Sequence, residues 1–504
     1  RETLDVAEKA GFEPIYGDSI TSERFVTVRN GDGYIEIKNI EQLFEENKEG
    51  VVSSRGKEFI PLANYEALSI DIRTRKPEWK KIKSLIRHKV NKKIYRVNQK
   101  YGETRVTEDH AIIADMNGRV VQAKPTEMGK KSFIAATTVP ESKQVKEIDL
   151  YEILKHYSFT RTTKRWERIS KVHADEEKIW FGWSNQKINR VYLKRHICVE
   201  SKEFESLCRL LGAYVAEGSS STPETTLSRT GASIASSNTQ WLEKLREDYE
   251  SLFTSHTKII PSSPEMRTLS YNNSSGMQTI QYQDETHKLQ MMNGVAAVFF
   301  KVLCGQKSNG KRLPDFIYNT PNSYKLLLLE KMIEGDGSHS VNKKLGYSKE
   351  YIEKNFSYTT KSLEAASGLC VLLRQLGINF TIQYRRSKKC YTLKTSSKWN
   401  KRLTTKIVEE PYAGFVYDLS VEDNENFVDA CGQVLLHNTD SAFVHVSKGY
   451  TEKDVAAFVE KVNKSLPGRM EIEFEGLYVR GLFVSKKDKK DFHAAKKRYA
   501  LADK

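Results

Sequence analysis

The organisation of this sequence is decided by two short stretches, Tyr16-Gly17-Asp18-Ser19 and His437-Asn438-Thr439-Asp440-Ser441. If the residues between them are taken out, the flanks join into one continuous motif, Tyr-Gly-Asp-Thr-Asp-Ser. The block that interrupts this motif starts with a hydroxyl residue, Ser19, and ends in a His-Asn pair. A second hydroxyl residue, Thr439, follows it. We therefore interpret residues 19–438 as a unit inserted into another protein.

The inserted block changes its own pattern along the chain. From residue 19 to about residue 114, short β-branched and aromatic runs alternate with Gly, Asn and Asp turns, which predicts an all-β unit. Residues 115–200 are basic and weakly patterned, and from about 203 to 400 helical and strand-like segments alternate. A short β-rich stretch returns after residue 407 and closes at Asn438. Because no low-complexity linker separates these parts, the pattern predicts one domain inserted inside another.

The composition narrows the class of protein. The net charge of +16 fits a polyanionic partner such as nucleic acid, and it equally fits a solvated basic surface. The six cysteines form no CxxC pair, which argues against a zinc site and a disulfide scaffold. No apolar run approaches the ~20 residues of a membrane helix, and no signal peptide opens the chain. Since the chain begins with Arg1, we expect a fragment of a longer protein.

The residue types at the two borders suit acyl transfer. Breaking a planar, resonance-stabilised peptide bond without a protease requires a nucleophile in the chain and a polarised amide. Ser19 and Thr439 supply hydroxyls, and a Thr-x-x-His element, Thr107 to His110, supplies an imidazole for proton transfer. Taken singly, His110 would fit an ordinary core or surface histidine and Asn438 a turn residue. The interpretation depends on their combination.

With two further stretches, Val416-Tyr417-Asp418-Leu419-Ser420-Val421-Glu422 and Asn426-Phe427-Val428, these residues resemble an intein, a self-splicing protein element. The resemblance implies an all-β Hint-type (hedgehog/intein) splicing domain that needs no cofactor. The catalytic residues that it implies are Ser19, Thr107, His110, Asp418, His437, Asn438 and Thr439.

The resemblance also implies an order of events. Ser19 attacks the Asp18 carbonyl while His110, oriented with the help of Thr107, acts on the Ser19 nitrogen. Thr439 then takes over the acyl group. Asn438 cyclises and releases the block, His437 donates protons, and Asp418 tunes these steps. Two positions depart from the common pattern: Ser19 replaces the frequent cysteine, whose thiolate is the stronger nucleophile, and Glu425 stands where a histidine is common.

The middle of the block holds two similar stretches, Leu210-Leu211-Gly212-Ala213-Tyr214-Val215-Ala216-Glu217-Gly218 and Leu329-Glu330-Lys331-Met332-Ile333-Glu334-Gly335-Asp336-Gly337. Either one alone would fit an ordinary apolar helix with an acidic end. Both together, in a basic domain, resemble the paired helices of LAGLIDADG homing endonucleases. The second copy has fewer small residues, with Lys331 and Met332, so it fits the family pattern more loosely.

The endonuclease resemblance implies an α/β domain that cuts double-stranded DNA. Glu217 and Asp336 would be the acids that bind Mg²⁺, a hard ion that prefers oxygen ligands. Lys311, in Lys311-Arg312-Leu313-Pro314, is a candidate active-site base or electrostatic helper. Residues 160–200 and 380–395 either contact phosphates and bases or form solvated surface. The natural target is the uninterrupted polymerase gene.

The ends of the chain, residues 1–18 and 439–504, resemble α+β palm fragments of a family B DNA polymerase. In that family the aspartates of the joined motif, here Asp18 and Asp440, hold Mg²⁺. The basic end is expected to contact primer-template DNA through Lys496, Lys497, Arg498 and Tyr499. Deoxynucleotides would be substrates of the complete host only, because the finger and exonuclease motifs are absent from this sequence.

The expected protein is therefore multidomain, with domains at residues 1–18, 19–135, 136–400, 401–438 and 439–504. The second and fourth segments form the splicing domain, and the third forms the DNA-recognition and endonuclease region. We expect a monomer with no membrane partner, in the cytoplasm of an archaeal-type host. Two alternatives remain: a protein whose activity is that of the polymerase alone, and an element whose splicing or DNA cleavage has decayed.

Overall fold

The computed structural model describes most of the inserted block and parts of the C-terminal segment. The described residues are 19–54, 57–108, 110–162, 167–185, 187, 190–224, 230–262, 266–273, 276–283, 285–336, 349–395, 404–438, 451, 453, 456–457, 459–460, 480–487 and 492–502. Residues 1–18, and with them the expected N-terminal segment, lie outside this part of the chain. So do residues 439–450 and most of 451–479.

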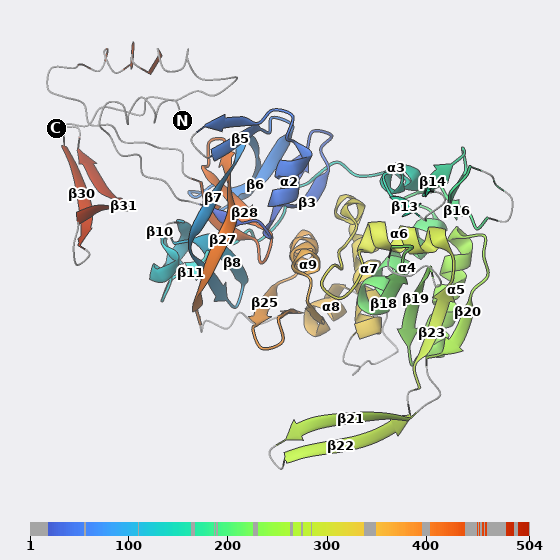
Figure 1. The fold of residues 1–504 in the computed structure, drawn as a ribbon. Helices are drawn as coiled ribbons and strands as arrows, with labels where there is room; N and C mark the ends of the chain where they lie inside the picture. The colour runs from blue at the N-terminus through green and yellow to red at the C-terminus, as the bar shows by residue number, and fades with distance from the viewer. Residues whose placement is uncertain are drawn as a thin grey trace.

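A 14-stranded β-structure is built from both ends of the inserted block. Its strands are β1 (Ile20–Thr21), β2 (Phe25–Asn30), β3 (Ile35–Asn39), β4 (Val52–Ser54), β5 (Lys57–Pro61), β6 (Tyr65–Ile70), β7 (Pro77–Gln99), β8 (Gly102–Thr107), β9 (Ile112–Met116), β10 (Arg119–Ala123), β11 (Ser132–Phe133), β27 (Lys406–Val421), β28 (Asn426–Asp429) and β29 (Val434–His437). One short helix, α2 (Ile40–Glu46), and a 3-10 turn, Pro125–Glu127, accompany them. In Figure 1 the orange strands of the C-terminal end lie among the blue strands of the N-terminal end.

The two ends are joined by long-range strand pairing. The strand β7 pairs antiparallel with β27 from Ile82 opposite Val421 to Asn98 opposite Lys406. The core between the strands is apolar and buried, with Ile20, Val106, Tyr417 and Leu436 among its members. Alternating apolar and polar residues place one face of each strand in this core. The splicing chemistry expected from the borders therefore falls on a single β-module, which we call the β-module (residues 19–136 and 404–438).

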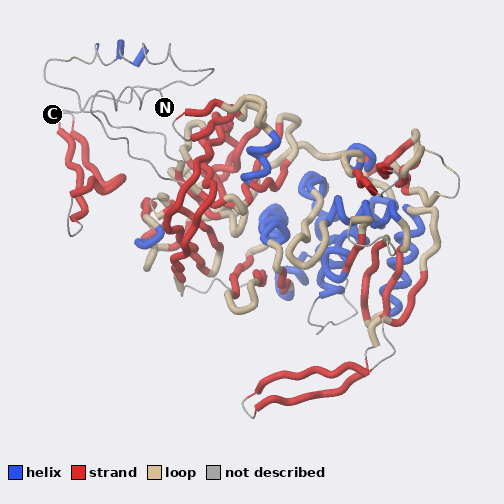
Figure 2. Tube along the Cα trace, viewed as in Figure 1, coloured by secondary structure: helices blue, strands red, loops and turns tan. Residues whose placement is uncertain are grey.

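The residues between the two ends form a separate α/β region. A first part holds β12 (Glu147–Asp149), α3 (Leu150–Leu154), β13 (Ser158–Thr162), β14 (Glu167–Ala174), β15 (Lys178–Gly182), β16 (Leu193–Lys194) and β17 (His196–Cys198). Next come α4 (Lys202–Glu217), β18 (Gly218–Ser221), β19 (Gly231–Ser236), α5 (Thr239–Leu252), β20 (Lys258–Pro261), β23 (His287–Met291) and α6 (Gly294–Cys304). Figure 2 shows the contrast between this helix-rich region and the β-module, which is mostly strand.

The second half of the α/β region repeats the plan of helix and sheet. It contains η2 (Asp315–Asn319), α7 (Asn322–Asp336), α8 (Lys349–Asn355), β24 (Ser357–Thr360), α9 (Leu363–Gln375), β25 (Phe380–Arg385) and β26 (Cys390–Thr395). The four-stranded order β18-β19-β23-β20 and the three-stranded order β24-β26-β25 are the two sheets that follow α4 and α7. This duplication matches the repeated helix pattern of the sequence.

The α/β region shares a core with the β-module. Ile35 and Ile37 of β3, and Cys431 after β28, belong to the same buried cluster as α4 and α9. Asn319 of η2 pairs with the backbone of Ile35 at both polar groups: its Oδ1 accepts from the Ile35 nitrogen at 2.8 Å, and its Nδ2 donates to the Ile35 oxygen at 2.9 Å. The inserted region is thus packed against its host module, and α9 lies between the two in Figure 1.

Two hairpins stand apart from these units. The strands β21 (Met266–Asn273) and β22 (Gly276–Gln283) form an arm that projects from the α/β region (Figure 1). The strands β30 (Arg480–Lys487) and β31 (Phe492–Ala502) pair near the end of the chain. Within the described residues, no helix is long and apolar enough to span a membrane.

Candidate functional site

The strand β1 places Ser19 between two other strands of the β-module. Ile20 lies opposite Val106 of β8 and opposite Tyr417 of β27. The backbone nitrogen of Thr107 donates a hydrogen bond to the Ser19 oxygen at 3.0 Å. Continuing the β1–β27 register by one residue puts Ser19 beside Asp418. Ser19, Thr107 and Asp418 are all buried, with exposed fractions of 2%, 0% and 7%.

The turn after β8 brings the other end of the block to the same place. The His110 nitrogen donates to the Thr107 oxygen at 3.1 Å, and the His110 side chain is fully buried. The next residue, Ala111, accepts from the His437 nitrogen at 3.1 Å, and Leu436 lies opposite Ile112. Through the strands β8, β9 and β29, both borders of the block therefore contact the short segment 107–111 that contains His110.

Asn438 is held by its backbone, while its side chain is not. Its nitrogen donates to the Glu425 oxygen at 2.9 Å. The side chain is fully buried, and neither Nδ2 nor Oδ1 has a hydrogen-bond partner among the described residues. Native proteins rarely leave both polar atoms of a buried amide unpaired, because each costs ~1–3 kcal/mol. The Asn438 amide therefore has no hydrogen bond within the described residues that would fix its orientation.

The loop that holds Asn438 is fixed by a second asparagine, Asn426. Asp423 and Glu425 have positive φ angles of 60° and 49°, which is a strained region for residues with a side chain. The buried Asn426 side chain accepts from Ser69 Oγ at 2.9 Å and from the Ile70 nitrogen at 3.0 Å. It donates to the Ile70 oxygen at 3.0 Å and to the Asn424 oxygen at 2.7 Å. Sequence reasoning placed Asn426 in a family block and gave it no role.

We predict that Asn426→Ala reduces cleavage after Asn438 more than it reduces cleavage before Ser19. The four hydrogen bonds of Asn426 hold the Glu425 carbonyl, which binds the Asn438 backbone, and the β1 border is fixed by other strands. The ratio of the two cleavage products, measured by mass spectrometry, checks this. Ser69→Ala removes only one of the four bonds and should change the ratio less. Equal loss of both cleavages would contradict the positioning role.

A buried ion network ties the two ends of the block together behind this site. Arg24 is fully buried and binds Asp429 through Nε and Nη2, each at 2.8 Å. Its Nη1 lies 3.3 Å from Glu103, and Thr104 Oγ1 donates to Asp429 at 2.8 Å. Burial opposes the charge of Arg24, but Asp429 and Glu103 raise its pKa well above the usual value. No sequence signal marks Arg24, because its partner Asp429 lies at the other end of the block.

The two helices with the repeated pattern meet in the α/β region. A methyl group added at Gly212 of α4 would collide with the Leu328 carbonyl oxygen of α7. One added at Gly335 would lie 2.8 Å from Ala216 Cβ and 3.2 Å from Glu217 Cγ. Glycines therefore permit a close approach from both helices. In the second copy Gly335 supplies the small residue at this contact, and Met332 is fully buried.

The ends of these helices hold the expected acids. Glu217 ends α4 and is half-buried, and Asp336 ends α7, where its side chain lies outside the described residues. Lys311 Nζ donates to the oxygens of Tyr214 and Gly218 at 2.6 and 2.7 Å and lies 3.6 Å from the centre of the Tyr214 ring. Burial lowers the pKa of Lys311 to about 8, although Glu217 opposes this shift. Lys311 thus holds the carbonyl end of α4 beside Glu217.

The structure does not describe the side chains of the remaining expected residues. Asp18, Thr439 and Asp440 lie outside the described residues. Lys496, Lys497, Arg498 and Tyr499 lie on β31, of which the structure describes the backbone alone. Within the part of the chain that the structure describes, no three His, Cys, Asp or Glu side chains gather as metal ligands.

The family model "Intein splicing domain" matches residues 31–438. The DNA polymerase of Thermococcus hydrothermalis is 27% identical over 96% of this chain, and that of Methanocaldococcus jannaschii is 23% identical over 97%. The chain spans 27% and 36% of the lengths of these two relatives. The crystal structure of the transcription factor IIB Mvu mini-intein is 18% identical, with a TM-score of 0.23, covering 25% of this chain and 72% of that one.

The family match includes the β-module from residue 31 onward and the α/β region between its two parts. It ends at Asn438, the residue that the sequence predicts as the last of the inserted block. Intein splicing is autocatalytic, and most of the matched β-module is strand. The chain belongs to the intein splicing domain family, and it is an intein associated with a DNA polymerase-like protein.

Proposed function

We propose that this intein joins Asp18 to Thr439 and so restores the Tyr-Gly-Asp-Thr-Asp-Ser motif of a family B DNA polymerase. The observation that carries this proposal is the convergence of both borders on one buried site. Thr107 binds the Ser19 carbonyl oxygen, and Ala111, next to His110, binds the nitrogen of His437. A reaction between two bonds this far apart in sequence requires that they be close in the fold.

The chemistry follows from the residues at each border. Ser19 Oγ adds to the Asp18 carbonyl, and the Ser19 nitrogen leaves as an amine after His110 supplies a proton. Thr439 Oγ then displaces the Ser19 oxygen and forms a new ester with Asp18. The Asn438 side-chain nitrogen attacks its own carbonyl, closes a succinimide and releases the Thr439 amine. That amine attacks the ester, and a peptide bond between Asp18 and Thr439 results.

Mass spectrometry of the expressed chain tests this proposal. Splicing gives a free block of residues 19–438 and a ligated product in which residue 18 precedes residue 439. A chain that stays intact, or that only falls apart into unligated pieces, would overturn the proposal. With the complete polymerase, the ligated aspartates Asp18 and Asp440 would hold Mg²⁺, and primer-template DNA and deoxynucleotides would be the substrates.

We also propose that the α/β region cuts double-stranded DNA as a LAGLIDADG-type endonuclease. The close contact of α4 and α7 at Gly212 and Gly335 supports this, because it brings the two helix ends together. Carboxylate oxygens at these ends fit Mg²⁺ as ligands. Glu217 and Asp336 would hold the ion, which would supply activation of water and stabilisation of the leaving oxygen. Lys311 fixes the end of α4 and thereby the position of Glu217.

We predict that Glu217→Gln abolishes cleavage of a duplex encoding the uninterrupted polymerase junction and leaves the yield of ligated product unchanged. The amide cannot supply the negative charge of the carboxylate, and Glu217 lies in the α/β region, away from the splicing borders. Gel electrophoresis of the duplex measures cleavage. Glu205→Gln, on the same helix but half-exposed and paired with Arg209, is the control and should still cut. Cleavage by the Glu217 variant would contradict the proposal; an uncut duplex with the unaltered chain would indicate a decayed nuclease.

A further inference from the structure

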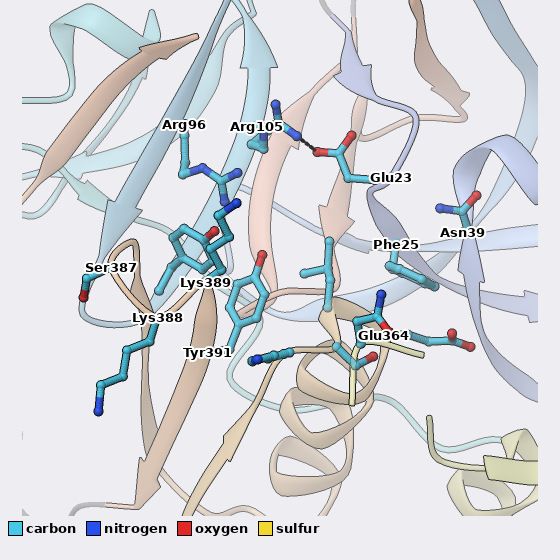
Figure 3. Close-up of a pocket in the computed structure, with 15 residues that line it drawn as sticks. Glu23, Phe25, Asn39, Arg96, Arg105, Glu364, Ser387, Lys388, Lys389 and Tyr391 are labelled. Atoms are coloured by element: carbon cyan, nitrogen blue, oxygen red, sulfur yellow. Dashed lines mark hydrogen bonds and ion pairs between the residues drawn. The ribbon is translucent and has the colours of Figure 1, made fainter. Parts of the chain in front are cut away.

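A cavity lies where the β-module meets the second half of the α/β region (Figure 3). Its volume is about 670 Å³, within the usual range of ligand sites. One wall comes from β7, β8 and the chain around β2, with Arg96, Arg105 and Glu23. The facing wall comes from the β25–β26 hairpin and the start of α9, with Lys389, Tyr391 and Glu364 (Figure 3).

The hairpin is fixed to the β-module, so the cavity has two firmly connected walls. The Ile382 nitrogen of β25 donates to the Lys100 oxygen at 2.9 Å. The Asn98 side chain donates to the Tyr384 oxygen at 3.4 Å. The Arg96 guanidinium lies over the Tyr384 ring at 4.4 Å, and Tyr384 contacts Tyr391 with ring centres 4.9 Å apart. The aromatic floor is therefore held by both units.

The charges around the cavity divide into paired arginines and lysines without partners. Arg96 binds Glu103 at 2.9 Å and Glu410 at 3.2 Å. Arg105 binds Glu410 at 2.7 Å and also contacts Glu23. Among the described residues no carboxylate pairs with the other three cations of the lining, Lys361, Lys388 and Lys389.

The neutral groups of the cavity add hydrogen-bond donors to this charge. Burial raises the pKa of the Tyr391 hydroxyl, and Glu103 raises it further, so the hydroxyl stays protonated and can donate. Asn309 and Ser387 also line the cavity, whereas the Asn39 amide in the same lining already donates to the Ser22 carbonyl oxygen at 2.9 Å. Lysine ammonium groups that pair with no carboxylate among the described residues, neutral donors and aromatic rings form a lining suited to phosphate oxygens beside planar bases.

We propose that this cavity binds phosphate groups of a DNA strand and so extends the DNA contact of the endonuclease onto the β-module. The proposal rests on the DNA cleavage proposed above, because the β25–β26 hairpin belongs to the nuclease half. A free oligophosphate offers the same chemistry, and the experiment separates the two sources. The splicing module is then part of the DNA-binding surface, and its arginines form the rigid wall against which the lysines hold the strand.

The test uses the full chain, kept intact by Ser19→Ala and Asn438→Ala. Lys361, Lys388 and Lys389 are changed together to Gln, and the binding of a duplex encoding the uninterrupted junction is measured against salt concentration. The binding constant falls as salt rises, and each lost phosphate contact makes the slope of log K against log salt less steep by about 0.9. We therefore expect the slope of the triple variant to be less steep by about 2–3. Lys76, Lys81 and Lys130 are exposed lysines outside the lining, and their change to Gln is the matched control.

The binding of inorganic triphosphate, measured by calorimetry, distinguishes a free oligophosphate from DNA as the source of the phosphate groups. A less steep salt dependence in the cavity variant, but not in the control, supports the DNA site. If only triphosphate binds, and the cavity variant loses it, the cavity takes a free oligophosphate, and the DNA proposal is overturned. An unchanged slope in a chain that still cuts DNA overturns the inference and leaves the nuclease standing. If the chain binds no duplex at all, the proposed nuclease fails together with this extension of it.

Discussion

Replacing Asn438 by alanine is expected to abolish the ligated product completely. The peptide bond between residues 438 and 439 can then no longer be broken by cyclisation, because alanine has no side-chain nitrogen. The block should stay attached to the C-terminal segment, and the N-terminal segment should still be released by hydroxylamine, which attacks the ester at Ser19. Mass spectrometry of the products after hydroxylamine treatment measures both outcomes.

The free energy of unfolding distinguishes loss of the cyclisation step in this variant from simple misfolding. Truncation removes two polar atoms that have no hydrogen-bond partner among the described residues, so it should not lower the free energy of unfolding. Asn91→Ala, at an exposed position on β7, is the control and should splice normally. Ligated product from the Asn438 variant would refute the cyclisation step.

Replacing Arg24 by methionine is expected to destabilise the chain by about 3–5 kcal/mol, because Asp429 would be left as a buried charge without its cation and Glu103 would keep only Arg96. Chemical denaturation of the chain kept intact by Ser19→Ala and Asn438→Ala measures the loss. The matched control is Arg29→Met. Arg29 binds Glu66 at 2.6 Å, but both side chains are about a quarter exposed, and such pairs contribute about 0–1 kcal/mol. Equal costs for the two variants would show that the network adds no stability.

The sequence predicts both borders of the block because chemistry restricts the residue types there, and the family match ends at one of them, Asn438. A hydroxyl, a His-Asn pair and a second hydroxyl are recognisable without any structure, and so is the repeated helix pattern. The structure adds what depends on long-range register. That Ser19 lies beside Asp418 follows from the pairing of β1 with β27, and no local pattern specifies that pairing.

Other features could not be predicted because their partners are remote in sequence or their roles are set by geometry. The Arg24–Asp429 pair joins opposite ends of the block. The Asn426 side chain hydrogen-bonds the backbone nitrogen and oxygen of Ile70, as a neighbouring strand would. Lys311 was expected as an active-site base or electrostatic helper, and its hydrogen bonds add the anchoring of a helix end. Whether it also acts on DNA stays a prediction.

The pairing of β7 with β27 has a consequence for synthesis. These strands are separated by the whole α/β region, so the contact order of the β-module is very high, and such topologies fold slowly. On the ribosome, β7 emerges long before β27 exists, and domains generally fold as they emerge. We therefore expect the α/β region to fold first and to carry the late strands back to the early ones. If the chain splices as proposed, the host can be cut and rejoined only after residue 439 has been translated, so translation sets the earliest time of maturation.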